Sequence, residues 1–153
     1  MGIERLAVGA LVGFVSKVIM DQATSPFYAR QSETSKRVEE ELAPGGTLVQ
    51  LGKQVGLAAG RDLSDDRAER LGVALHRTLG MSYGIAASLL VGRGLRPLWA
   101  GLAMGIAGLV VVDGGTSISS FSNYPLESHM RGVVGHGTYG LAAGLLLSLV
   151  ERS

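Results

Sequence analysis

Residues 9–25 read GALVGFVSKVIMDQATS, and residues 101–117 read GLAMGIAGLVVVDGGTS. The two stretches share the pattern G-x3-G-x7-D-x2-T-S at an offset of 92 residues. A second similarity links YGIAASLL at 83–90 with YGLAAGLL at 139–146. Self-similarity in this order predicts two copies of a helical hairpin, an arrangement that is common in membrane proteins.

The glycines of these stretches are candidate helix-packing residues. Glycines four positions apart lie on one helix face and let a second backbone approach closely, which drives helix association in lipid. Two arrangements are open: Gly9 and Gly13 pack on Gly101 and Gly105 within the chain, or one copy contacts a neighbouring subunit. The candidate packing residues are Gly9, Gly13, Gly101, Gly105, Gly140 and Gly144.

Composition narrows the class of protein. The 153 residues suffice for one domain, the net charge of +1 gives no reason to expect nucleic acid, and the absence of cysteine excludes disulfides. Charged residues concentrate at 30–77 and nearly vanish from four stretches of 15 to 19 residues, which are 6–20, 78–92, 97–112 and 132–150. These stretches are slightly short for the ~20 residues that cross ~30 Å of hydrocarbon. The alternative is a soluble bundle, whose helices would have polar outer faces, and 97–112 has none.

We therefore predict an all-α fold: a four-transmembrane-helix bundle built from two repeated helical hairpins, forming a single integral membrane domain over 1–153. Pro26 is expected to end the first helix, because the residue before a proline avoids helical angles. A long extramembrane connection with short helices, 29–64, joins the first two spans. The expected long helices cover about 3–23, 65–91, 97–113 and 127–150.

Basic residues predict the orientation. The short segments on the side of the termini carry Arg5, Arg93, Arg96 and Arg152, and the short connection on the other side carries only Arg131. Lys and Arg prefer the cytoplasmic side of short loops, so both termini are expected in the cytoplasm. Arg70 and Arg77, close to the second span, argue for the opposite orientation.

The predicted topology also gathers polar residues. Odd helices end where even helices begin, so one depth band near the outer surface holds Lys17, Asp21, His76, Asp113 and His136, with Glu127 at the same end. Ionisable groups in membranes usually face the bundle interior in pairs, and Lys17 and Asp21 are spaced to pair along one helix. One interpretation is an ion or small-ligand site, or a proton-responsive cluster through His136. The other is a structural salt bridge with helix-end hydrogen bonds. No short-range ligand motif supports a metal.

Two segments resemble the YagU-like family of bacterial inner-membrane proteins. The resemblance rests on GFVSKVIMDQATSP at 13–26, and on VVGHGTYG at 133–140 preceded by PLES at 125–128. It implies a bacterial inner-membrane location but no particular reaction, and the long connection differs from the family pattern. By this resemblance, the family's motif positions are Lys17, Asp21, Glu127 and His136.

The sequence favours a non-enzymatic role. It has no nucleophile–base pair, phosphate-binding glycine loop or cofactor motif, so neither an enzyme nor a cofactor is expected. The first hypothesis is a membrane protein that assembles with itself or joins a membrane complex, with the lipid bilayer as its environment. The second is a small proton- or ion-coupled channel or transporter. The apolar inner half argues against a water path through one protomer, so a pore would lie on a homo-oligomer axis.

Overall fold

The structure is a computed structural model that describes residues 2–113 and 123–151. Every regular element in that part is helical, which confirms the predicted all-α class. In chain order the elements are α1 (Ile3–Ala29), α2 (Glu33–Leu42), α3 (Thr47–Ala58), α4 (Asp65–Gly92), α5 (Pro97–Gly108), the π-helix η1 (Leu109–Asp113) and α6 (Leu126–Val150).

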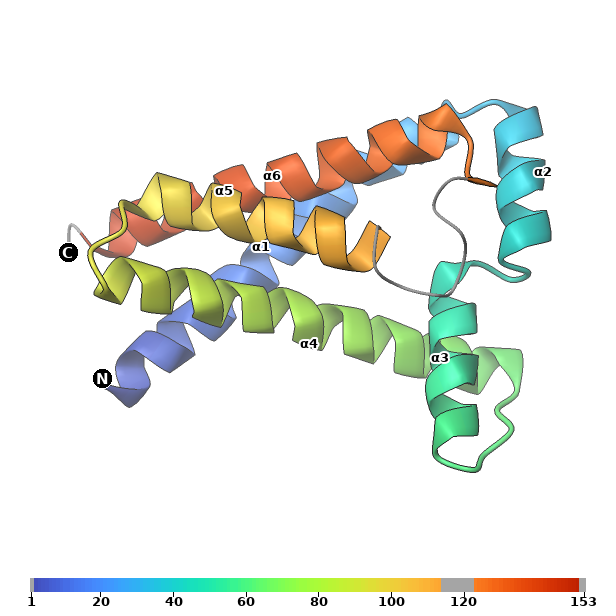
Figure 1. Cartoon of the computed structure of the whole chain (residues 1–153), viewed down its shortest axis with the longest axis horizontal. Coiled ribbons are helices and arrows are strands. Elements are labelled where there is room, and N and C mark those ends of the chain that lie inside the picture. Colours follow the sequence, from blue (N-terminus) through green and yellow to red (C-terminus); the bar gives the residue numbers. More distant parts are fainter. Residues whose placement is uncertain (1, 114–122, 152–153) are drawn as a thin grey trace.

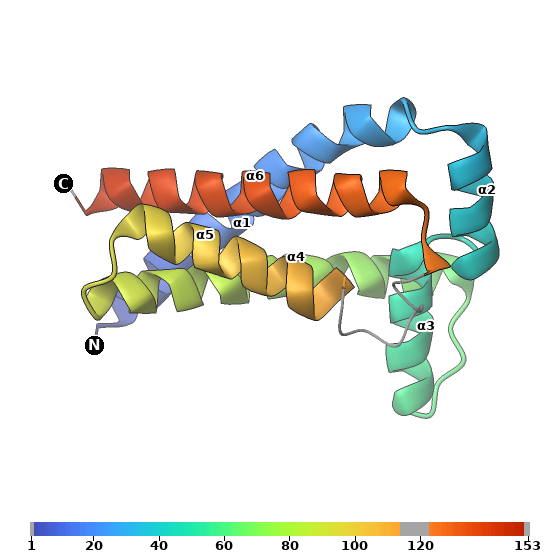
Figure 2. The same ribbon diagram turned by 45° about the horizontal axis from the view of Figure 1, so that its top comes forward.

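Four helices run lengthwise and two lie across one end. The termini and the turn between α4 and α5 share the other end of the bundle (Figure 1). α1 crosses obliquely, so that its N-terminal half contacts α4 and its C-terminal half contacts α6 (Figure 2). The core between the long helices is small and includes Val12, Ala87, Ala100, Tyr139, Ala143 and Leu147.

The first helix is longer than predicted. It continues through Pro26 to Ala29 instead of ending before the proline. Proline removes one backbone donor from a helix, and side-chain hydroxyls bond to carbonyl groups in the turn before it. Thr24 Oγ1 donates to the Met20 carbonyl at 3.0 Å and Ser25 Oγ to the Asp21 carbonyl at 2.7 Å. The prediction that Pro26 ends the helix is wrong, because the helix continues for another turn to Ala29.

The third long helix changes its geometry at Leu109. α5 is regular to Gly108 and is followed by five residues of π-helix, which the sequence pattern did not indicate. Asp113 is placed only as the last residue of η1, and its side chain lies outside the described part, as do Thr116 and Ser117 of the repeated pattern.

The glycines pair within each hairpin, not between the two copies as the first predicted arrangement has it. A Cβ added at Gly9 would lie 2.6 Å from the Cα of Ile85, and one at Gly13 would meet the Gly80 carbonyl, so both face α4. A Cβ added at Gly105 would lie 2.5 Å from the His136 carbonyl oxygen. Gly101 and Gly105 likewise face Gly140 and Gly144 of α6, so each glycine pair closes the crossing within its own hairpin.

Membrane-capable length and composition are found in one helix of the described residues. Leu126–Val150 is long and apolar enough to cross a membrane, and Pro97–Val111 is apolar but shorter.

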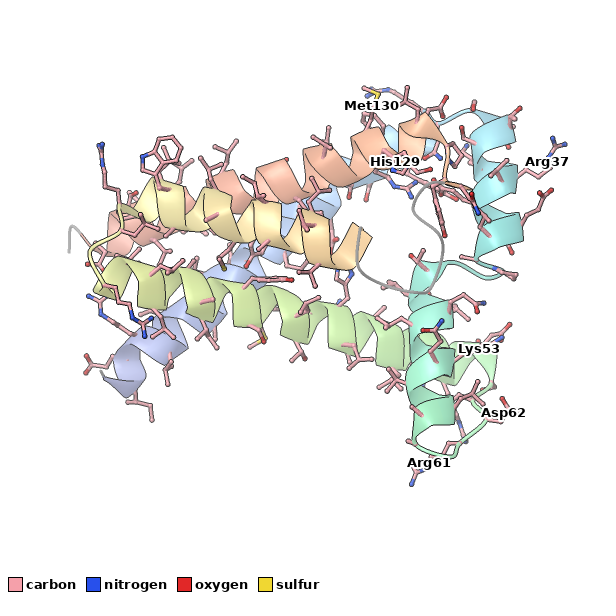
Figure 3. All side chains as sticks on the ribbon, in the orientation of Figure 1. Arg37, Lys53, Arg61, Asp62, His129 and Met130 are labelled. Carbon is pink, nitrogen blue, oxygen red and sulfur yellow. The ribbon has the colours of Figure 1, made fainter. Side chains whose placement is uncertain are left out.

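At the far end, α3 packs across the start of α4, where Gly52 faces Ala68 and Gly72 faces Leu48. This end carries exposed charged side chains, among them Arg37, Arg61 and Asp62 (Figure 3).

Candidate functional site

A buried lysine marks the place where α1, α4 and α6 meet. Lys17 is 5% exposed, and its aliphatic stem lies against Gly80, where an added Cβ would be 3.2 Å from the lysine Cβ. Its ammonium group forms an ion pair with Asp21 one turn later, and the Asp21 side chain is 55% exposed. The positive charge is therefore inside the bundle while its counter-charge is at the surface.

His136 occupies a slot made by glycines on two helices. The side chain is buried, and an added Cβ at Gly108 of α5 would lie 2.7 Å from its Nδ1 atom. Gly135, the residue before it, makes room for Met20 of α1, whose Cε atom would lie 2.9 Å from an added Cβ. The imidazole is thus held between α5 and α6, close to the junction that contains Lys17.

His76 lies on α4 one turn before Gly80, the residue against which the Lys17 stem packs. The structure thus brings together four of the predicted site residues, which are Lys17, Asp21, His76 and His136. Among the side chains that the structure describes, no three histidines, aspartates or glutamates gather to hold a metal ion.

Two hydroxyl groups complete the cluster. Tyr139 of α6 is buried and donates a hydrogen bond of 2.6 Å to the Gly80 carbonyl, which ties α6 to α4. Ser16 is fully buried beside Lys17, and its hydroxyl has no hydrogen-bond partner. A buried polar group without a partner costs about 1–3 kcal/mol, so Ser16 is the least satisfied member of this region.

The predicted site residue Glu127 lies in a different network. Its carboxylate accepts a hydrogen bond of 2.8 Å from the backbone N–H of Ser32, which lowers the pKa of Glu127. Glu127 therefore connects the start of α6 to the start of α2. Glu127 was predicted at the same end of the bundle as Lys17, and in the structure its carboxylate bonds to the start of α2 rather than to Lys17.

Sequence reasoning missed most of that second network. Arg131 of α6 forms an ion pair of 3.1 Å with Glu39 of α2 and donates a hydrogen bond of 2.7 Å to Gln31. Its guanidinium also lies 5.0 Å from the centre of the Tyr28 ring, and a cavity of about 270 Å³ adjoins these residues. The available signal was that Arg131 is the one Lys or Arg among residues 126–150, near the start of a mostly apolar helix, so it needed a partner from elsewhere.

Comparison with known proteins identifies no relative. No protein-family model, curated protein sequence or solved structure matches this chain. Functional inference therefore depends on which side chains the fold buries and which it exposes.

Proposed function

We propose that this chain is a four-span membrane protein that acts without enzymatic chemistry, as a subunit of a membrane assembly. One observation carries the proposal: polar groups are buried in the long helices while large apolar side chains point outward. Lys17, Ser88 and His136 are buried, whereas Leu11 of α1 is 65% exposed and Ile106 of α5 is 63% exposed. In water, burying polar groups and exposing large apolar side chains are both unfavourable. In a bilayer, apolar outer faces contact lipid and ionisable groups face the bundle interior.

Apolar exposure extends over three of the long helices. In α1 the outward side chains recur along one side of the helix, and in α6 they continue from its first turn to its end. They are Leu11, Phe14, Val18 and Ile19 of α1, Val110 and Val111 of η1, and Val133, Val134, Leu141, Leu145 and Leu149 of α6. This distribution supports lipid contact around the bundle rather than a single docking patch.

Helix lengths fit the proposed spans. α1 has 27 residues, α4 has 28 and α6 has 25, and a rise of ~1.5 Å per residue makes each longer than ~30 Å of hydrocarbon. α5 and η1 together are shorter, which a thinner bilayer around them would accommodate. The basic residues near the termini support cytoplasmic ends, and the resemblance to YagU-like proteins supports a bacterial inner membrane.

Assembly in this proposal uses outward faces rather than the glycines. Because the glycine pairs are occupied within the chain, self-association or a partner subunit would contact the apolar faces of α1, α5 and α6, or the exposed α2 and α3.

The test has two parts. After an alkaline carbonate wash, the chain is expected to stay in the membrane pellet. After gentle detergent extraction, native mass spectrometry should give a mass above the 15.9 kDa of one chain, or a reproducible partner. Release by carbonate would refute the membrane assignment, and a lone monomer from native membranes would refute the assembly.

A second candidate function is a proton- or ion-coupled conduit. It is favoured by the buried Lys17, the adjacent Ser16 hydroxyl without a partner, and the two nearby histidines. Backbone contact at the glycine crossings leaves little room for water between α1 and α4 or between α5 and α6. A pore would therefore lie on an oligomer axis. A pH-dependent flux into liposomes that disappears in His136→Ala, with the native mass unchanged, would favour this candidate over the first.

A further inference from the structure

The turn between α4 and α5 has a rigid backbone. The N–H of Gly94 bonds to the Val91 carbonyl at 2.9 Å, and the N–H of Leu95 bonds to the Leu90 carbonyl at 3.1 Å. Gly94 has a φ of +96°, which completes the hydrogen-bond pattern of a Schellman motif at the end of α4. The residues that flank Gly94 are therefore held in fixed relative positions at the end of the bundle that also holds both termini (Figure 1).

Two exposed arginines flank this turn without a counter-charge from the described part of the chain. Arg93 and Arg96 are exposed, and neither takes part in an ion pair there. The sequence has no acidic residue from 70 to 112. Of the acids at this end, Glu151 is paired with Arg5 at 3.0 Å, and Glu4 is exposed at the start of α1.

Three cations at the opposite end have acidic partners within the chain, whereas exposed arginines such as Arg61 and Arg67 have no ion pair in the described part. Lys36 pairs with Glu33 at 2.8 Å, Lys53 with Asp65 at 2.6 Å, and Arg131 with Glu39 at 3.1 Å. At that end acids and bases alternate closely along the chain, whereas the α4–α5 turn is basic only. The guanidinium groups of Arg93 and Arg96 therefore form no ion pair with the described part of the chain and are available to an external anion.

Apolar and aromatic side chains adjoin the two arginines on the bundle side. Trp99 is 57% exposed, and Leu95 and Leu98 are also exposed. Tryptophan prefers the level of lipid headgroups, and planar guanidinium groups bind phosphate oxygens with two parallel hydrogen bonds. Together these residues provide a phosphate-binding group followed immediately by a surface for acyl chains.

We propose that the α4–α5 turn binds the phosphate headgroup of an anionic phospholipid through Arg93 and Arg96, with Trp99 and the neighbouring leucines against the acyl chains. The inference rests on the proposed membrane function, since the turn must lie at a bilayer surface. It commits to a lipid rather than free phosphate, because the exposed apolar residues have no role in holding a soluble ion.

The experiment measures binding of short-chain phosphatidylglycerol and phosphatidylcholine to the full chain in detergent micelles by native mass spectrometry. Each basic residue near an anionic surface is expected to contribute about fivefold in affinity, so R93Q/R96Q should lose about 25-fold for phosphatidylglycerol and little for phosphatidylcholine. The control variant R61Q/R67Q removes two exposed arginines at the opposite end, where Figure 3 shows Arg61. It is expected to bind phosphatidylglycerol as the unmodified chain does.

Unchanged phosphatidylglycerol binding in R93Q/R96Q, or an equal loss in R61Q/R67Q, would overturn the proposal. So would competition by millimolar inorganic phosphate that displaces the lipid completely, because the site would then recognise phosphate alone. Trp99→Ala alone should weaken the binding of phosphatidylglycerol, because it removes a side chain that contacts the acyl chains. Carbonate extraction of the unmodified chain tests the membrane assignment separately, so failure of the two ideas can be told apart.

Discussion

The α1–α4 crossing and the α5–α6 crossing use the same backbone device with opposite side-chain roles. In the first, Lys17 comes from the earlier helix and lies over Gly80 of the later one. In the second, His136 comes from the later helix and lies over Gly108 of the earlier one. The offsets of the repeated stretches make Gly80 equivalent to His136, and they make Gly108 equivalent to Ser16, the neighbour of Lys17.

The comparison shows that two different sets of residues have two different roles. Glycines allow the helices to approach closely, whereas Lys17 and His136 supply the polar side chains of the interior. The glycine pairs at 9/13 and 101/105 set the close approach in both crossings. The polar side chain can come from either helix, as long as a glycine opposite leaves room for it. The second copy of the repeat has no lysine in the position of Lys17. The equivalent residue is Leu109, the first residue of the π-helix.

The largest expected effect is loss of a crossing when a methyl group is added between two backbones. Gly84→Ala and Gly101→Ala each place a Cβ against backbone atoms of the partner helix, so each should lower the free energy of unfolding by about 3 kcal/mol. Unfolding in mixed micelles, followed by circular dichroism, measures the loss.

Gly137→Ala is the matched control for these two variants. Nothing lies within 4 Å of a Cβ at Gly137, and alanine is favoured over glycine inside a helix by about 1 kcal/mol. Equal destabilisation of all three variants would mean that the two crossings are not backbone contacts.

The next comparison concerns the buried ion pair. Asp21→Asn leaves the Lys17 ammonium buried without its counter-charge, whereas Lys17→Met leaves Asp21 at the surface, where water solvates it. Removing one partner of a fully buried pair costs about 3–5 kcal/mol. Because Asp21 is half exposed, we expect Asp21→Asn to be less stable than Lys17→Met by about 1–2 kcal/mol. Urea titrations of both variants decide the order, and the reverse order would show that Lys17 is solvated.

A smaller difference in stability is expected between variants at Gly108, which faces His136, and at Gly80, which faces Lys17. An added Cβ at Gly108 meets the rigid His136 ring at 2.7 Å, whereas one at Gly80 meets the flexible Lys17 stem at 3.2 Å. We expect Gly108→Ala to cost about 1–2 kcal/mol and Gly80→Ala to cost roughly half as much. The double variant Gly108→Ala/His136→Ala should recover part of the loss in thermal unfolding. Without such recovery, the ring would not be what occupies the slot.

The smallest effect is the pH dependence of the contact between α2 and α6. The Ser32 N–H holds the pKa of Glu127 below its ordinary value. A depressed carboxyl pKa stabilises the folded state above the ordinary value of 4.5, and that contribution disappears as the pH falls through the lowered pKa. The protection of amides at the start of α2 against hydrogen exchange, relative to the unfolded chain at the same pH, should therefore fall below about pH 4.5. In Glu127→Gln this protection should already be low at neutral pH, and protection independent of Glu127 would contradict the contact.

Much of the helical layout could be predicted because its signals are local. Ser64-Asp65-Asp66 marks the start of α4 and Pro97 the start of α5, since helix ends depend on caps and on proline chemistry within one turn. Pro26 was misread because a proline removes one hydrogen bond without ending the helix, which continues beyond it with the Arg30 N–H bonded to the Pro26 carbonyl. The π-helix after Gly108 gave no signal at all, since its geometry is set by packing rather than by residue type.

Residue spacing was enough to predict the all-helical class and the two matching glycine pairs, and it led to the expectation that Lys17, Asp21, His76 and His136 share one region, because helical periodicity and antiparallel order act along the chain. The partners of those residues came from the folded molecule. Which helix the glycines face, and the meeting of Arg131 with Glu39, depend on distances between segments far apart in the chain. Local spacing carries no record of such distances, because many pairings of the same helices would satisfy the same pattern.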